Sequence, residues 1–196
     1  MRRVTLVIAA MALALVMASG VALAVNKVGT NGADTLTGTD GNDTLVGRGG
    51  DDRILSQAGK DKLLGGMGKD ILLGGTESHA SGGDKILVGG PGNDVISGGQ
   101  GSDNALGGAG NDQLAGDLHD PSSDKHVGGG GNDVIFAVNE PAVRDLVVCG
   151  GGLDWVLVDR KDVVAADCEK VFVGFGSVDE WFESIPQSFW EGLPQV

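Results

Sequence analysis

Aliphatic residues recur along the chain at a spacing of nine, and each stands two residues after an aspartate. The triplet around each one can form a very short strand whose central side chain points inward. We therefore predict short parallel strands joined by turns, with two repeats, or eighteen residues, making one coil of a solenoid. The side chains expected to point inward are Leu36, Leu45, Ile54, Leu63, Leu72, Ile86, Ile96, Leu114 and Ile135.

The aspartates that precede these residues stay in phase over about a hundred residues. They are Asp34, Asp43, Asp52, Asp61, Asp70, Asp84, Asp94, Asp103, Asp112, Asp124 and Asp133, and a glycine stands two residues before ten of these eleven. A disordered glycine-rich linker would not hold three positions in phase, so a folded solenoid is the better interpretation.

Three insertions interrupt the phase: five residues at 76–80, one at Val88 and three at 118–120. Insertions in a solenoid usually loop out of one face. The repeat around Asp124 is the weakest, because Ser122 replaces its glycine and His126 stands where an aliphatic residue should point inward. Asp124 is therefore left out of the predicted ligands.

Five repeats carry the full pattern Gly-Gly-x-Gly-x-Asp, beginning at Gly65, Gly89, Gly98, Gly107 and Gly128. With this pattern, residues 29–136 resemble the haemolysin-type, or RTX, calcium-binding repeat family. The resemblance implies an all-β fold, a right-handed parallel β-roll, in which each calcium ion lies between one turn and the turn two repeats on. The aspartates then expected at the metal are Asp34, Asp43, Asp52, Asp61, Asp70, Asp84, Asp94, Asp103, Asp112 and Asp133.

Elementary chemistry supports calcium (Ca2+) at these turns. Calcium takes six to eight hard oxygen ligands, and glycines allow the tight turns that aim carbonyl oxygens at one point. Stacked turns also bring aspartates of like charge together, while the strands bury only about one aliphatic residue per nine. We therefore expect the ion to supply much of the folding free energy.

The composition is consistent with a protein that binds cations. There are 36 glycines, no tyrosine and a formal net charge of −13, which argues against nucleic acid and anionic membranes as partners. The glycine runs are not phosphate loops, since each holds an aspartate and none leads into Gly-Lys-Ser/Thr. The chain contains no His-Glu-x-x-His or Gly-x-Ser-x-Gly motif and no EF-hand loop, so we expect no enzyme activity.

Residues 1–24 are predicted to be a signal peptide. Arg2 and Arg3 precede an apolar run, and Ala22-Leu23-Ala24 offers a small-x-small cleavage site, so the secreted chain should begin at Val25. An uncleaved membrane anchor is the alternative, because apolar character persists to Val25. We divide the remainder into a β-roll at 25–136, a degenerate strand-rich cap at 137–176 and an aromatic tail at 177–196.

The cap contains the two cysteines, Cys149 and Cys168. In an exported chain an isolated pair is expected to form a disulfide, and metal ligation would want more sulfur or histidine nearby. Short strands are expected at 147–148, 155–158, 163–164 and 171–173. The aromatic tail either packs on the end of the solenoid or binds a partner.

Several readings stay open. The three histidines, His79, His119 and His126, are interpreted as chance surface residues, with a transition-metal site as the alternative. Asp154, Asp159 and Asp162 could bind another ion, although a solvated surface is the simpler role.

The predicted function is a secreted, non-catalytic calcium-binding protein, either adhesive, part of the cell envelope or a calcium buffer. The alternatives are a structural or ice-binding solenoid and an enzyme with an unrecognised site.

Overall fold

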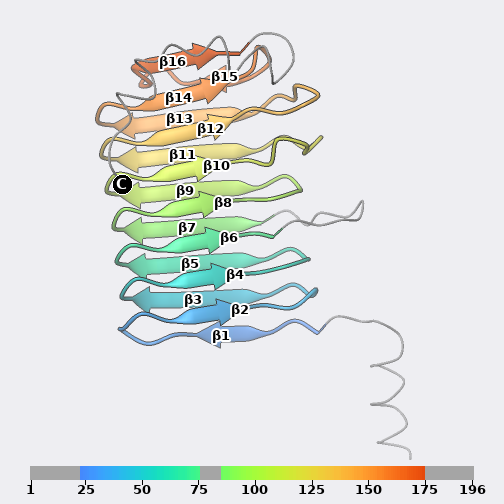
Figure 1. Ribbon diagram of the computed structural model, residues 1–196, viewed down its shortest axis with the longest axis vertical. Helices are drawn as coiled ribbons and strands as arrows, with labels where there is room; N and C mark the ends of the chain where they lie inside the picture. The colour runs from blue at the N-terminus through green and yellow to red at the C-terminus, as the bar shows by residue number, and fades with distance from the viewer. Residues whose placement is uncertain (1–22, 76–84, 175–196) are drawn as a thin grey trace, which may run out of the picture.

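Short strands alternate with turns along the chain, as the nine-residue pattern predicts (Figure 1). The structure is a computed structural model that describes residues 23–75 and 85–174. These residues form sixteen strands, and no helix occurs among them. The described part of the chain accordingly holds no helix that could cross a membrane.

The strands form two parallel sheets of eight strands each, and the chain enters the sheets alternately. The odd sheet consists of β1 (Asn26–Val28), β3 (Thr44–Gly49), β5 (Lys62–Met67), β7 (Ile86–Pro91), β9 (Asn104–Ala109), β11 (Lys125–Gly130), β13 (Leu146–Gly151) and β15 (Val163–Val164). The even sheet consists of β2 (Thr35–Thr37), β4 (Arg53–Leu55), β6 (Ile71–Leu73), β8 (Val95–Ser97), β10 (Gln113–Ala115), β12 (Val134–Ala137), β14 (Trp155–Val158) and β16 (Lys170–Val173). Each strand pairs only with the strands one coil before and after it, so the architecture is the parallel β-solenoid that the sequence predicts.

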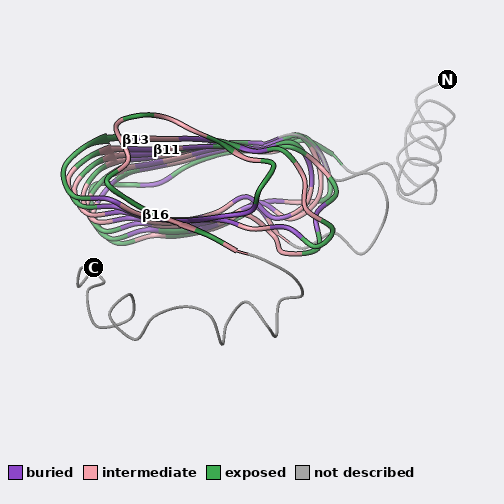
Figure 2. Ribbon diagram, turned by 90° about the horizontal axis from the view of Figure 1, so that it is seen from above, coloured by how far each residue is buried: buried purple, intermediate pink, exposed green. Residues whose placement is uncertain are grey.

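The core consists of two columns of inward-pointing side chains, one from each sheet. Figure 2 shows the two sheets end-on, with buried residues in purple along both. In the odd sheet the register aligns Leu45, Leu63, Leu87, Ala105, His126, Val147 and Val164. In the even sheet it aligns Leu36, Ile54, Leu72, Ile96, Leu114, Ile135, Val156 and Val171. With about one inward side chain per strand, the solenoid has a thin core.

The predicted inward residues are confirmed with one exception. Ile86 is 48% exposed, and its neighbour Leu87 is fully buried in its place. Val88 is not an insertion, because it pairs with Leu64 on one side and Leu106 on the other. The extra residue of this coil therefore lies before β7, which shifts the predicted phase here by one.

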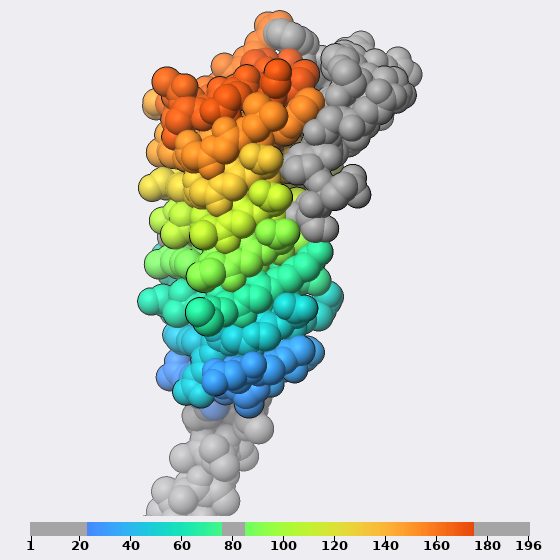
Figure 3. All heavy atoms as spheres, turned by 90° about the vertical axis from the view of Figure 1, so that its left-hand side faces the viewer, coloured from blue at the N-terminus to red at the C-terminus, as the bar shows by residue number. Residues whose placement is uncertain are grey.

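The two edges of the solenoid differ. We call the edge where odd strands lead into even strands the regular edge, on the left in Figure 1 and facing the viewer in Figure 3. Its turns are nearly uniform, and all full Gly-Gly-x-Gly-x-Asp repeats except the one at Gly98 lie there. The opposite, irregular edge carries the lengthened connections from β6 to β7, from β10 to β11 and from β12 to β13. The insertions therefore loop out on one side, as predicted.

Glycine is required on the regular edge because successive coils touch through their backbones. Gly129 has φ +123°, and a methyl group placed on it would lie 2.0 Å from the carbonyl oxygen of Gly108 in the preceding coil. The next residue, Gly130, has open space around its Cα, with nothing within 4 Å of such a methyl group. The two glycines are adjacent, but only the first is demanded by packing.

The solenoid continues beyond the glycine-rich repeats to Val173. The four strands predicted in the cap correspond to β13, β14, β15 and β16. Cys149, within β13, and Cys168, just before β16, form the predicted disulfide with their Cα atoms 5.2 Å apart. The aromatic tail from 177 and the predicted signal peptide up to residue 22 lie outside the described residues.

We predict that Gly129→Ala lowers the free energy of unfolding by about 2–4 kcal/mol, since alanine at positive φ is strained and its methyl group would overlap the neighbouring coil. Gly130→Ala should change it by no more than about 0.5 kcal/mol. Denaturant unfolding with calcium present measures both variants. Equal losses would show that the coils do not approach each other as closely as described.

Candidate functional site

An aspartate stands immediately before most strands, and its Oδ1 atom links that coil to the preceding one. On the regular edge the backbone N–H of each aspartate donates to Oδ1 of the aspartate one coil later, at 2.8 Å in every step. This regular-edge ladder comprises Asp34, Asp52, Asp70, Asp94, Asp112, Asp133 and Asp154. Hydrogen bonds along the stacking direction tie each coil to the next.

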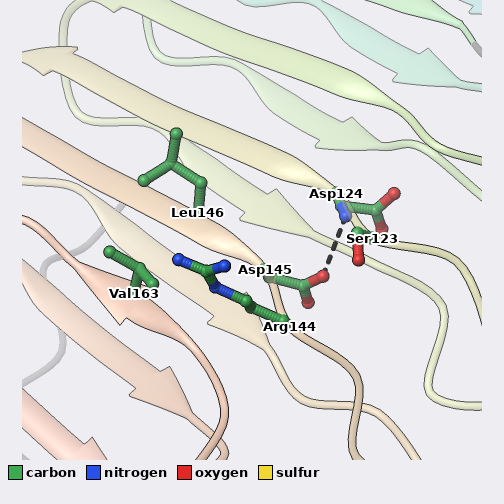
Figure 4. A pocket seen from close by; sticks show the side chains of 6 residues that line it. All are labelled: Ser123, Asp124, Arg144, Asp145, Leu146 and Val163. Carbon is green, nitrogen blue, oxygen red and sulfur yellow. Dashed lines mark hydrogen bonds between the residues drawn. The ribbon is translucent and has the colours of Figure 1, made fainter.

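The irregular edge has its own ladder, which comprises Asp43, Asp61, Asp103, Asp124, Asp145 and Asp162. Figure 4 shows one step, in which the Asp124 N–H donates to Oδ1 of Asp145 at 2.8 Å beside an open pocket lined by Arg144, Leu146 and Val163. Where the register requires an aspartate between Asp61 and Asp103, the chain has Lys85. Asp84 itself lies outside the described residues, so its predicted role as a ligand stays a prediction.

The second carboxylate oxygen, Oδ2, is unsatisfied in most of the ladder. It is buried and has no hydrogen-bond partner among the described residues in Asp52, Asp61, Asp70, Asp94, Asp103, Asp112, Asp124, Asp133, Asp145 and Asp154. A buried carboxylate oxygen without a partner is costly, so repeating it coil after coil indicates a missing cation.

Backbone carbonyl oxygens face the same space on the regular edge. A methyl group placed on Gly107, the first residue of its turn, would lie 2.3 Å from Oδ2 of Asp112 and 2.6 Å from the carbonyl oxygen of Gly128 in the next coil. The same pair of oxygens surrounds the first glycine of five further turns, those beginning at Gly29, Gly47, Gly65, Gly89 and Gly128. Each such step therefore holds a cradle made of one carboxylate oxygen and one carbonyl oxygen from adjacent coils.

The first aspartate of each ladder is different. Oδ2 of Asp34 accepts hydrogen bonds from the Thr30 N–H at 2.5 Å and the Thr30 hydroxyl at 2.9 Å. Oδ2 of Asp43 accepts the Thr39 N–H at 2.5 Å in the same way. Both residues were predicted ligands, but their carboxylates are satisfied within their own turns, so the open oxygens begin at Asp52 and Asp61.

Burial raises the pKa of several ladder carboxyls. The pKa rises to about 6 for Asp94 and Asp133, to about 7 for Asp112 and to about 8 for Asp103, and desolvation is the largest cause in each case. Neighbouring aspartates of the same ladder raise these values further, while backbone N–H donors oppose the change. Burial therefore penalises the ionised form of these carboxyls when no metal is bound.

This donor set suits calcium better than a softer metal. Among the described residues no three histidine, cysteine, aspartate or glutamate side chains come together as a cluster that could hold a metal. Any ion held here must take carbonyl oxygens as well as carboxylates, and all-oxygen sets with flexible geometry are typical of calcium. The residues placed to hold it on the regular edge are Asp52, Asp70, Asp94, Asp112 and Asp133, with a carbonyl oxygen of the next coil, which belongs to a glycine in four of these steps and to Cys149 at Asp133.

Three of the ladder aspartates with an open Oδ2 were not among the predicted ligands. Asp124, Asp145 and Asp154 have the same unsatisfied Oδ2 as their neighbours, and the nine-residue spacing of Asp145 and Asp154 was their signal. At Asp124 the space is wider: a methyl group on Gly116 would lie 3.3 Å from its Oδ2, and the next atom is Nε2 of His126 at 3.6 Å. No carbonyl oxygen of the next coil is among the three nearest atoms there, which supports ranking this step below the full repeats.

A further ladder, made of asparagines, was not predicted from the sequence. Oδ1 of Asn93 accepts the Asn111 N–H, and Oδ1 of Asn111 accepts the Asn132 N–H, at 2.9 and 2.8 Å. Asn132 continues the ladder to the Leu153 N–H at 2.9 Å. In this ladder the N–H of the later coil donates to the earlier coil, which is the reverse of the direction in the aspartate ladders. The recurring Gly-Asn-Asp triplet was its signal in the sequence.

His126 is buried, contrary to the surface position predicted for it. Only 1% of it is exposed, and neither ring nitrogen has a hydrogen-bond partner within the described part of the chain. Burial lowers its pKa to about 4, so the imidazole is neutral. His126 fills an inward position between Ala105 and Val147, which explains its burial but not its polarity.

The fold and this oxygen-lined edge define a metal-binding parallel β-solenoid. Four copies of the RTX calcium-binding nonapeptide repeat match the chain, at residues 28–63, 57–77, 79–117 and 124–137, and together they cover just over half of it. The chain belongs to this family, and calcium is its ligand. Comparison with curated proteins and with solved structures found no match.

The raised pKa values predict how the metal-free protein responds to pH. A carboxyl whose pKa is higher in the folded chain stabilises the fold below about pH 4 and loses that contribution as pH rises through its folded value. In the presence of a chelator the free energy of unfolding should therefore fall between about pH 4 and pH 8. The lowered pKa of His126 makes stability rise with pH, but it concerns one group, whereas several ladder carboxyls have raised pKa values.

Denaturant unfolding at several pH values, with chelator and with calcium, tests this expectation. With calcium the trend should reverse, since acid releases the ion from its carboxylates. Stability that rises with pH in chelator would contradict the burial of ionisable carboxyls in the ladder.

Proposed function

We propose that this protein is an exported, non-catalytic calcium-binding protein whose solenoid folds as it binds the ion. One observation carries the proposal: at successive steps of the regular edge a buried, unpartnered Oδ2 and a carbonyl oxygen of the next coil face the same space. When bound, calcium supplies two positive charges that neutralise the ladder and join the coils on either side of it.

The coupling of folding to calcium is supported by the forces that oppose the metal-free fold. Fifteen glycines of the described residues adopt positive φ, and glycine loses more conformational entropy on folding than any other residue. The core that must offset this loss contains one inward side chain for most strands. The ladder adds repulsion between buried carboxylates of like charge. Calcium removes the last of these terms directly and favours the state in which the coils are stacked.

Export is supported by features outside the ladder. The predicted signal peptide ends with Ala22-Leu23-Ala24, and the disulfide between Cys149 and Cys168 suits an oxidising compartment. Calcium is also most plentiful outside the cell, where modules that bind it at about 10⁻⁴–10⁻³ M are typical. A non-catalytic role is supported by the ladders, which account for all the aspartates with strongly shifted pKa values among the described residues.

The exported protein should begin at Val25. N-terminal sequencing of material secreted by the native host measures this directly. A membrane-bound product that still begins at Met1 would mean that residues 1–24 act as an anchor and not as a cleaved signal.

The ladder geometry predicts which substitutions weaken calcium binding. In Asp112→Asn the amide oxygen can still accept the Asp94 N–H, but the amide nitrogen replaces Oδ2 and cannot coordinate a cation. We expect Asp112→Asn to bind one calcium ion fewer than the wild type at 1 mM calcium, or to need about ten times more calcium for that step.

Asp51→Asn is the matched control. It removes the same charge from the same edge, but Asp51 is exposed and its Oδ1 only accepts the Lys69 N–H, which the amide oxygen preserves. Isothermal titration calorimetry of the two variants separates a ligand from a nearby charge. Equal binding curves for both would refute the assignment of Oδ2 as a ligand.

A further inference from the structure

Lys85 occupies an aspartate position in the irregular-edge ladder. The register aligns Ile86 with Lys62 and with Asn104, which follow Asp61 and Asp103. The Lys85 N–H donates to Oδ1 of Asp103 at 2.8 Å, and its carbonyl accepts the Asn104 N–H at 3.0 Å. The Lys85 backbone therefore makes the same hydrogen bonds that an aspartate makes at the remaining steps of this ladder.

The Lys85 side chain runs through the space that a carboxylate occupies elsewhere. A methyl group placed on Gly74, the first residue of this turn, would lie 2.8 Å from Cδ of Lys85 and 1.8 Å from the carbonyl oxygen of Gly98. At Gly98, one coil later, the nearest atom to such a methyl group is Oδ2 of Asp103 at 2.5 Å. The lysine stem thus fills the cradle between the turns at 74–85 and 98–103.

The Lys85 ammonium group is buried and donates to a backbone carbonyl oxygen. Only 1% of Lys85 is exposed, which makes it one of the largest fully buried side chains of the described residues, and Nζ donates to the carbonyl oxygen of Gln100 at 3.1 Å. Its charge lowers the pKa of Asp103 and of Asp61, the ladder aspartates on either side, against the effect of burial. A buried ammonium is stable only where carboxylates and carbonyls compensate it, and this edge offers the same oxygens that calcium uses.

We propose that the Lys85 ammonium is a resident cation that takes the place of calcium beside Gly74 and the carbonyl oxygen of Gly98. This inference rests on the proposed function, since it concerns which steps of the ladder bind calcium. The step at Lys85 needs no ion, so the coils on either side of the long insertion are joined by the chain's own charge. The calcium-binding steps of the irregular edge are accordingly divided into Asp61 on one side and Asp103, Asp124 and Asp145 on the other.

The number of calcium ions bound by the full chain tests the inference. Equilibrium dialysis should find one more ion bound to Lys85→Asp than to the wild type, because the substitution restores the carboxylate and removes the competing ammonium. Lys62→Asp is the control: it makes the same charge change at an exposed position one coil earlier and should add no ion. A folded Lys85→Asp variant that binds no additional ion would overturn the inference.

Lys85→Met gives an independent readout of folding with calcium present. Methionine keeps an unbranched apolar stem but leaves the carbonyl oxygens at this step without the ammonium, so at about 1 mM calcium and pH 8 this variant should unfold at a lower denaturant concentration than the wild type. An unchanged or higher midpoint would mean that the ammonium is a burden and not a counter-ion, and would overturn the inference even if Lys85→Asp did not fold. A wild-type chain that binds no calcium at all would instead contradict the proposed function.

Discussion

The structure depends on how each ladder aspartate divides its two oxygens. Oδ1 accepts the backbone N–H of the aspartate one coil earlier, as between Asp112 and Asp94, and this bond fixes the position of the carboxylate. In most of these aspartates Oδ2 is thereby held at a buried position where no donor among the described residues reaches it. The hydrogen bond that stacks the coils therefore also positions the open oxygen between them, which is why we propose that stacking and calcium binding are coupled in this fold.

This constraint explains the composition of the turns. Second and fourth residues of most turns on the regular edge lie against the backbone of the adjacent coil at positive φ, as Gly108 and Gly110 do, so glycine is favoured there, and Arg48, with φ 89°, is an exception among the described residues. Thr30 and Thr39 show the other solution: in the first turn of each ladder a threonine at the second position satisfies Oδ2 internally. Glycine at the second position of the turn thus leaves Oδ2 of the aspartate without a donor, and threonine supplies one.

The sequence predicts the fold well because one period governs both strand and turn. The inward residues and the insertions follow from phase and spacing, and the disulfide follows from an isolated cysteine pair in a chain expected to be exported. The failure at Ile86 has a local cause: Asp84 and Lys85 are adjacent, and only the pairing of Val88 with Leu64 and Leu106 decides which of them lies in the ladder. Asp34 and Asp43 matched the pattern, but threonine hydrogen bonds that no spacing reveals satisfy their carboxylates. The asparagine ladder was visible in the sequence, but its meaning depends on the backbone of a neighbouring coil.

The central claim is that calcium ions between the coils hold this solenoid together. Far-UV circular dichroism of the purified protein at pH 8, titrated with calcium after chelation, tests it most directly, with magnesium as the matched titration. The account predicts little β signal in chelator, a cooperative rise with calcium, and a much weaker response to magnesium, which demands stricter octahedral geometry and sheds water reluctantly. A full β spectrum in chelator that calcium leaves unchanged would contradict it.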